Sequence, residues 1–126
     1  MEGVTAPSDS SADRGAARAR EYLQLVEAGR TDDAEQLLTG LTDTRELVYV
    51  GAEFTALARR TGRTLPTAMR AQASSRQVLL GQLRDRNRGD ADGLRTWLRE
   101  AAAEVQTVQR LAEAARRRLG EQASAG

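Results

Sequence analysis

Apolar residues recur at helical spacing between Asp43 and Gly62, in the stretch DTRELVYVGAEFTALARRTG. Asp43 can cap the first free backbone N–H groups, and Glu46 three residues later completes the pattern of a capping box. Gly62 stands where helices commonly close on a left-handed residue. The apolar face consists of Leu47, Val50, Phe54, Leu57 and Ala58. The pattern predicts a helix over 43–61 at the centre of a small all-helical domain.

Two shorter apolar patterns precede this stretch. One predicts a helix over 12–28, and its stripe consists of Ala12, Ala16, Ala19, Leu23 and Val26. The other predicts a helix over 31–39, capped by Thr31 and closed by Gly40. Together, residues 23–38 resemble one helical pair of a tetratricopeptide repeat. No second copy follows at a fixed period, so the pattern predicts a simple pair of antiparallel helices.

Residues 65–87 form the fourth predicted helix. Thr64 is the expected cap, and Pro66 lies in the first turn, where its missing N–H costs nothing. The apolar side chains that we expect to face inward are Leu65, Met69, Ala73, Leu80 and Leu83. A polar turn over 84–93 then leads to the last helix.

The last predicted helix, 91–119, carries the longest regular pattern in the chain. Its apolar positions are spaced four and three residues apart over more than three heptads: Leu94, Leu98, Ala101, Val105, Val108, Ala112, Ala115 and Leu119. Such a seam is typical of a coiled coil or of a long helix in an antiparallel bundle. We favour packing on the 65–87 helix across the short turn, and a homodimer is the alternative.

The sequence therefore predicts an all-α fold, a single small domain of about five helices arranged as an antiparallel bundle. The helical domain spans 12–119. Residues 1–11 and 120–126 are small, polar and without periodicity, so we expect disordered tails there.

The composition excludes several classes of catalytic and metal-binding site. The chain has no Cys and no His, and all of its basic residues are Arg, so common thiolate, zinc and His general-base sites are excluded. The acidic residues over 85–92 do not have calcium-loop spacing, and Glu100 and Glu104 are interpreted as solvated helix charges. We expect no catalytic residue, no cofactor, no metal and hence no enzyme.

No leader-like or membrane-spanning apolar run occurs in the sequence. The absence of Lys and Ile is typical of a high-GC bacterial genome. We therefore expect a bacterial, cytoplasmic protein with no membrane partner.

Charge is distributed unevenly along the chain although the net charge is only +1. Residues 1–58 carry 5 Arg and 11 acidic residues, whereas residues 59–88 carry 8 Arg and a single acidic residue, Asp85. We favour the interpretation that the Arg-rich segment neutralises the acidic first 58 residues, within the fold or across an oligomer. The alternative is binding to nucleic acid, because phosphate neutralisation needs a local excess of this kind.

Residues 57–71, LARRTGRTLPTAMRA, resemble the helix-turn-helix of bacterial transcriptional repressors. The matching positions are Leu57, Ala58, Gly62 and Thr64. The sequence departs from the usual pattern at Arg63, Ala68 and Gln72. The resemblance implies that Arg63, Thr67 and Arg70 would lie near bases, with Arg59, Arg60 and Arg76 on phosphates.

Taken together, the patterns favour a small non-enzymatic interaction or regulatory protein. Its partner would be another protein or a second copy, bound by the Arg-rich face or by the long last helix. The alternative is a helix-turn-helix DNA-binding regulator. The candidate contact residues are the same in both cases: Arg59, Arg60, Arg63, Thr67, Arg70 and Arg76.

Overall fold

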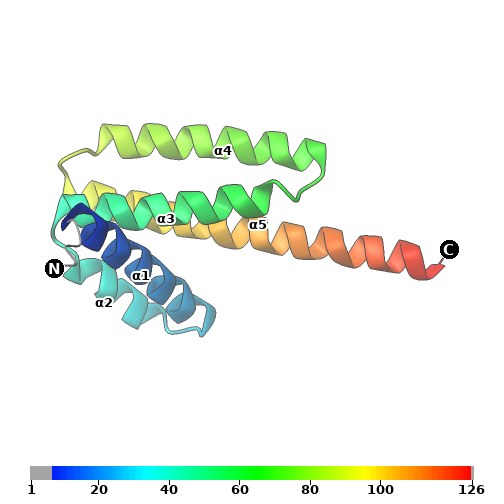
Figure 1. Ribbon diagram of the computed structural model, residues 1–126, viewed down its shortest axis with the longest axis horizontal. Coiled ribbons are helices and arrows are strands. Elements are labelled where there is room, and N and C mark those ends of the chain that lie inside the picture. The colour runs from blue at the N-terminus through cyan, green and yellow to red at the C-terminus, as the bar shows by residue number, and fades with distance from the viewer. Residues whose placement is uncertain (1–6, 126) are drawn as a thin grey trace, which may run out of the picture.

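The computed structural model describes residues 7–125, with side chains from 11 to 124, and this part of the chain is all-α. The helices are α1 (Pro7–Glu27), α2 (Thr31–Gly40), α3 (Thr44–Gly62), α4 (Thr67–Arg86) and α5 (Ala91–Ala125). Figure 1 shows α3, α4 and α5 side by side, with α1 and α2 at one end. The predicted small all-helical domain is confirmed.

The first and last helices in the chain are longer than the sequence patterns predict. Helix α1 begins at Pro7 rather than near residue 12, and a proline is well suited to a first helical position. Helix α5 continues through Gly120 to Ala125. The remainder of the two predicted tails, residues 1–6 and 126, lies outside the described residues.

Two turns contain a glycine with a left-handed backbone, but Gly62, where we expected such a residue, is not one of them. Gly29 and Gly89 are the described residues with positive φ, at 76° and 81°. Gly62 instead is the last residue of α3 and is buried, so the prediction of a left-handed closing residue there is wrong. Thr64 does not cap α4 either. Pro66 holds that position, and the Thr64 hydroxyl donates to the Thr61 carbonyl at 2.7 Å.

The core lies chiefly between α3 and α5, which run parallel to each other (Figure 1). The predicted cap at the start of α3 is confirmed, because the Asp43 carboxylate accepts from the Arg45 N–H at 2.9 Å. The predicted apolar face of α3 is buried except for Leu57, which is half-buried. Gly51 leaves room for the Trp97 ring of α5, because a Cβ at Gly51 would lie only 2.0 Å from that ring. The largest fully buried side chains are Trp97, Phe54, Leu38, Leu47, Leu94, Leu98, Val50, Val105 and Val108.

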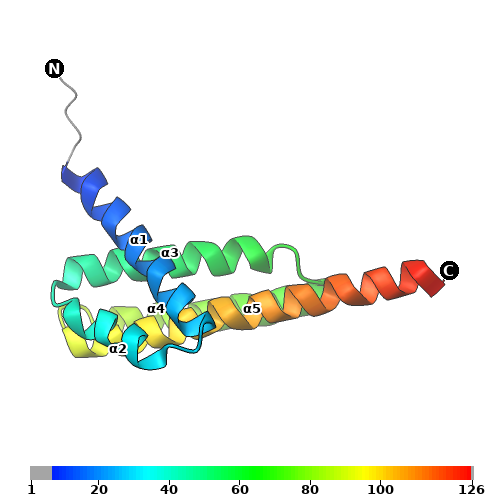
Figure 2. The same cartoon turned by 90° about the horizontal axis from the view of Figure 1, so that it is seen from below.

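Helix α1 crosses α3 obliquely, as Figure 2 shows. At the crossing, Gly15 is buried, and a Cβ there would lie 2.5 Å from the Tyr49 Cβ. The glycine that weakens α1 as an isolated helix therefore permits its close approach to α3. Further along, Tyr22 packs on Phe54 with ring centroids 5.8 Å apart.

Polar contacts join α2 to α5. Arg95 donates to the carbonyls of Leu38 and Leu41 at 3.0 and 2.9 Å, and so satisfies acceptors at the end of α2. Arg99 pairs with Glu35 at 2.9 Å, and the hydrogen bond raises the pKa of Arg99. Burial, with the nearby Glu35 charge, raises the pKa of Tyr22.

The seam of α5 has a different main partner from the one predicted. It packs chiefly on α3, and the expectation that it packs on the 65–87 helix is wrong for most of its length. Helix α4 contributes a single buried residue, Ala73. The seam is buried as far as Ala112, and beyond it α5 projects from the bundle (Figures 1 and 2).

Candidate functional site

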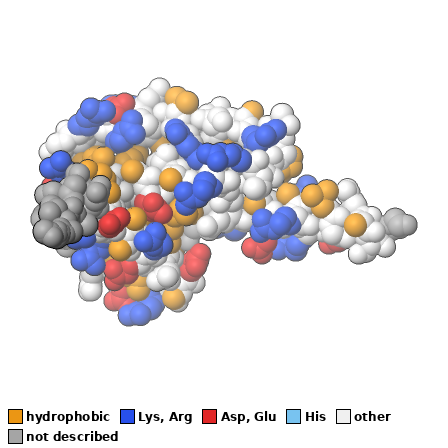
Figure 3. Space-filling view, viewed as in Figure 1, with side chains coloured by type: hydrophobic (Ala, Val, Ile, Leu, Met, Phe, Trp, Pro, Cys, Tyr) orange, Lys and Arg blue, Asp and Glu red, His pale blue; other side chains and the backbone are white. Residues whose placement is uncertain are grey.

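The basic segment 59–88 forms the end of α3 and all of α4. On the face seen in Figure 3, basic side chains gather over α3 and α4, and acidic side chains are concentrated over α1 and α2. Basic and acidic residues, which are separated along the sequence, are therefore also separated on this face of the molecule.

Internal neutralisation does not account for this excess. Among the described residues, no ion pair joins the basic segment to residues 1–58. The acidic half pairs elsewhere: Glu53 lies 3.7 Å from Arg20, and Glu35 lies 2.9 Å from Arg99. Within the basic segment, Arg76 pairs with Glu104, and Arg84 and Arg88 pair with Asp85. The other five arginines form no ion pair among the described residues and remain available to a partner: Arg59, Arg60, Arg63, Arg70 and Arg86.

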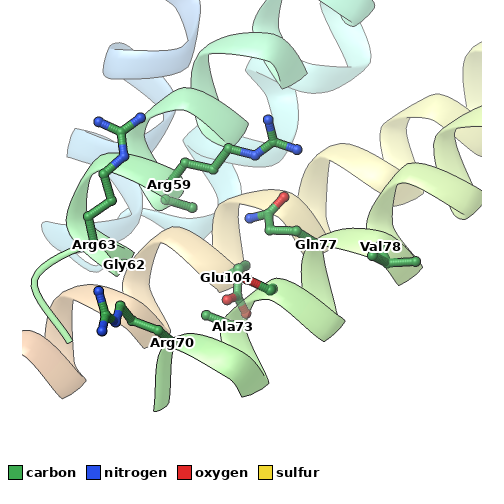
Figure 4. A pocket seen from close by; sticks show the side chains of 10 residues that line it. Arg59, Gly62, Arg63, Arg70, Ala73, Gln77, Val78 and Glu104 are labelled. Carbon is green, nitrogen blue, oxygen red and sulfur yellow. The ribbon is translucent and has the colours of Figure 1, made fainter. Parts of the chain in front are cut away.

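A cleft of about 430 Å³ opens between α3 and α4, with α5 beneath it (Figure 4). We call it the arginine cleft. Its lining residues are Ala58, Arg59, Gly62 and Arg63 of α3 and its end, Arg70, Ala73, Ser74, Gln77 and Val78 of α4, and Glu104 of α5. The α4 residues follow one helical stripe, and small residues on both walls keep the cleft open.

Three arginines stand at the rim of the arginine cleft. Arg59 and Arg63 are four residues apart at the end of α3, and Arg70 comes from the first turns of α4. All three are exposed. Arg70 donates to the Thr67 hydroxyl at 3.2 Å, but no ion pair among the described residues involves any of the three. Three unpaired guanidinium groups around one opening can bind carboxylates or phosphates.

Two of the other candidate contact residues, Arg60 and Arg76, do not stand at the rim of the arginine cleft. Arg60 is exposed but does not line the arginine cleft. Arg76 turns inward, where its Nε donates to a carboxylate oxygen of Glu104 at 2.7 Å. The structure thus brings Arg59, Arg63, Thr67 and Arg70 together and separates Arg76 from them.

Glu104 is the functional residue that sequence reasoning misplaced. Its exposed fraction is only 6%, so the interpretation of this residue as a solvated helix charge is wrong. A signal was present, because Arg76 continues the inward spacing of Met69, Ala73, Leu80 and Leu83. A charged residue on such a line needs a buried partner of opposite charge. The pair is incomplete: Arg76 Nη2 and Glu104 Oε2 are buried without hydrogen-bond partners.

The connection between α3 and α4 differs from a DNA-binding helix-turn-helix. Figure 1 shows the two helices running antiparallel, joined by residues 63–66. The two helices of a DNA-binding helix-turn-helix cross at about 90–120°, which exposes the second one to the major groove. Here α4 lies along α5 instead.

The described part of the chain contains no group of three or more acidic, His or Cys side chains placed to hold a metal ion. No helix within it combines the length and apolar character that crossing a membrane requires. The chain matches no known protein-family model, no curated protein and no solved structure.

Proposed function

We propose that this chain is a small non-enzymatic interaction protein that binds an anionic segment of a partner protein at the arginine cleft. The observation that carries the proposal is the set of exposed guanidinium groups of Arg59, Arg63 and Arg70, which have no carboxylate partner in the described fold. They surround walls formed partly by uncharged small side chains.

The walls favour a protein segment over a nucleic acid. Ala58, Gly62, Ala73 and Val78 offer apolar surface between the arginines. An amphipathic segment could place apolar side chains on these walls and carboxylates at the rim, which is a common way to recognise a helix in a groove. Phosphates alone would leave the apolar walls unused.

The experiment titrates the protein with a labelled, helix-forming peptide of about six turns that carries an Ala/Leu stripe flanked by Glu. A peptide of the same composition in scrambled order is the ligand control. We expect the patterned peptide to bind more tightly, and its affinity to fall between about 50 and about 200 mM salt because exposed charge pairs are screened.

The matched variants remove equal charge at two places. Arg59→Ala/Arg63→Ala/Arg70→Ala is expected to abolish peptide binding, whereas Arg116→Ala/Arg117→Ala/Arg118→Ala, on the projecting end of α5, is expected to retain it. Equal loss in both variants would mean that net charge alone drives binding, and the proposed site would be wrong.

DNA binding is the second candidate function, because Arg63, Thr67 and Arg70 are all exposed at the same end of the molecule. Random-sequence duplex DNA is titrated over the same salt range with the same two variants. Binding that is steeply salt-dependent and lost only in the cleft variant, with no peptide binding, would favour DNA over a protein partner.

A further inference from the structure

Helix α4 has an exposed side that carries no charge. Charged residues make up 29% of the chain, but residues 71–83 contain Arg76 alone, and its guanidinium turns inward to Glu104. The opposite side of the helix is exposed, and we call it the uncharged face of α4: Ala71, Ser74, Ser75, Val78, Leu79 and Gln82. Figure 1 shows α4 along an outer edge of the molecule, with no other helix of the described chain on that side.

The composition of the uncharged face is that of an interface with another protein. Val78 is 59% exposed and Leu79 is 62% exposed. The exposed sides of α1 and α5, in contrast, are rich in charged residues. Protein interfaces are depleted of charge at the centre and enriched in arginine, and large apolar side chains that lie together in solvent often mark such a site.

An unpaired arginine stands at each end of the uncharged face. Arg70 precedes it and Arg86 follows it, and both are exposed without an ion pair among the described residues. The neighbouring acid, Asp85, is held by Arg84 and Arg88 at 3.1 Å each. Sixteen positions of an α-helix correspond to about 24 Å. A complementary partner therefore has carboxylates at two places about 24 Å apart and an uncharged, partly apolar surface between them.

The α4 helix of a second copy does not meet this requirement. In an antiparallel pair of α4 helices, Arg70 of each copy would lie near Arg86 of the other. In a parallel pair, each of these arginines would lie near its own counterpart. Like charges that meet across an interface suppress association, so the ends of the face favour a different, acidic chain.

Building on the proposed function, on which this inference rests, we propose that the segment bound at the arginine cleft is a helix that continues along the uncharged face of α4 to Arg86. Ser74 and Val78 line the arginine cleft and also belong to this face, so the two surfaces are continuous. One acidic end of the bound helix contacts the arginines of the cleft, its apolar stripe covers Val78 and Leu79, and its other acidic end contacts Arg86. Helical spacing places Arg70 and Arg86 on different sides of α4, so the bound helix crosses α4 obliquely, as packed helices commonly do.

Two labelled helical peptides of equal composition test the spacing of the acidic ends. One carries Glu at both ends of an uncharged Ala/Leu stripe, with the two groups about 16 residues apart, and the other carries all of its Glu at one end. We expect the first peptide to bind roughly two- to fivefold more tightly, which is the effect of an exposed charge pair, and we expect Arg86→Ala to remove this preference. Arg110→Ala removes an exposed arginine from α5 and is expected to keep it.

Leu79→Glu tests the centre of the uncharged face. It replaces an apolar contact with a charge of the same sign as the bound segment, so we expect the affinity for the first peptide to fall at least tenfold. Leu119→Glu makes the same change at a position that is 66% exposed on α5 and is expected to leave the affinity unchanged. Circular dichroism of each variant checks that the helices are retained.

The failure of this contact can be distinguished from the failure of the proposed function. If neither peptide binds, the proposed function is wrong, and the contact along α4 is wrong with it. Binding that is lost in Arg59→Ala/Arg63→Ala/Arg70→Ala but unchanged in Leu79→Glu and Arg86→Ala would retain the arginine cleft and overturn the contact along α4.

Two other occupants of the face are tested with the same variants. Self-association of the chain in sedimentation equilibrium that Leu79→Glu abolishes would assign the face to a second copy. Binding to vesicles of phosphatidylcholine and phosphatidylglycerol that is tighter than peptide binding and lost in Leu79→Glu would assign it to a membrane surface. Either result would overturn the proposed helical partner.

Discussion

Helix α5 has two very different contacts within one bundle. On the side of α3 it buries Trp97, Leu94 and Val105, and the apolar face of α3 was predicted from the sequence. Against α4 it buries Ala73 and an ion pair with two unsatisfied atoms. The contact with α3 stabilises the fold because it buries apolar surface. The contact with α4 buries little apolar surface. The comparison shows that α4, which carries part of the arginine cleft, is the helix least constrained by the core.

Trp97→Ala is expected to destabilise the fold more than any other variant considered for α5. It removes the ring that fills the space left by Gly51, and large core truncations of this kind cost about 3–5 kcal/mol. The free energy of unfolding from urea titration measures the loss. Val78→Ala, at an exposed position on α4, is the control, and a comparable loss there would mean that α4 shares the core.

The second variant, Arg76→Ala, tests how α4 is held. It leaves the buried Glu104 carboxylate without its cation, and we expect a loss of about 1–3 kcal/mol, since the Arg76 side chain is 35% exposed and partly screened. Hydrogen exchange in α4 is expected to accelerate more than in α3.

A matched double variant separates charge from packing. Arg76→Met/Glu104→Leu replaces both groups with apolar side chains and is expected to recover most of the stability lost in Arg76→Ala. A double variant no more stable than Arg76→Ala would show that the loss comes from removing the ion pair and not from the charge left buried.

Two glycines, one at a helix crossing and one in open space, are expected to respond in opposite ways to a methyl group. Gly15→Ala brings a Cβ to within 2.5 Å of the Tyr49 Cβ, so we expect destabilisation of about 1–2 kcal/mol despite the better helix propensity of Ala. Gly120→Ala has no neighbouring atom within 4 Å and is expected to increase helicity by circular dichroism. A gain of stability in both would mean that α1 does not approach α3 closely.

The spacing of apolar residues predicted the helices and their buried faces better than it predicted which helices pack together. The α5 seam as far as Ala112 is buried as predicted, and so is the α3 face apart from the half-buried Leu57. The seam was assigned to the neighbouring helix in the chain, because a stripe specifies a face but not which helix covers it. The fit of Trp97 against Gly51 depends on two residues far apart in the sequence.

The candidate site was predictable only in part. A run of arginines with few acidic residues indicated the basic surface, and Arg59, Arg63 and Arg70 do surround one cleft. Arg76 could not be separated from them by charge alone, because its role depends on Glu104, 28 residues away.

The weak attachment of α4 also has a consequence for binding at the arginine cleft. One wall of the cleft belongs to α4, which contributes a single buried residue, Ala73. A segment that contacts both walls would also order α4, and the conformational entropy lost in that ordering would lower the affinity. A variant that fixes α4 more firmly to α5 would therefore bind the same segment more tightly without any new contact to it.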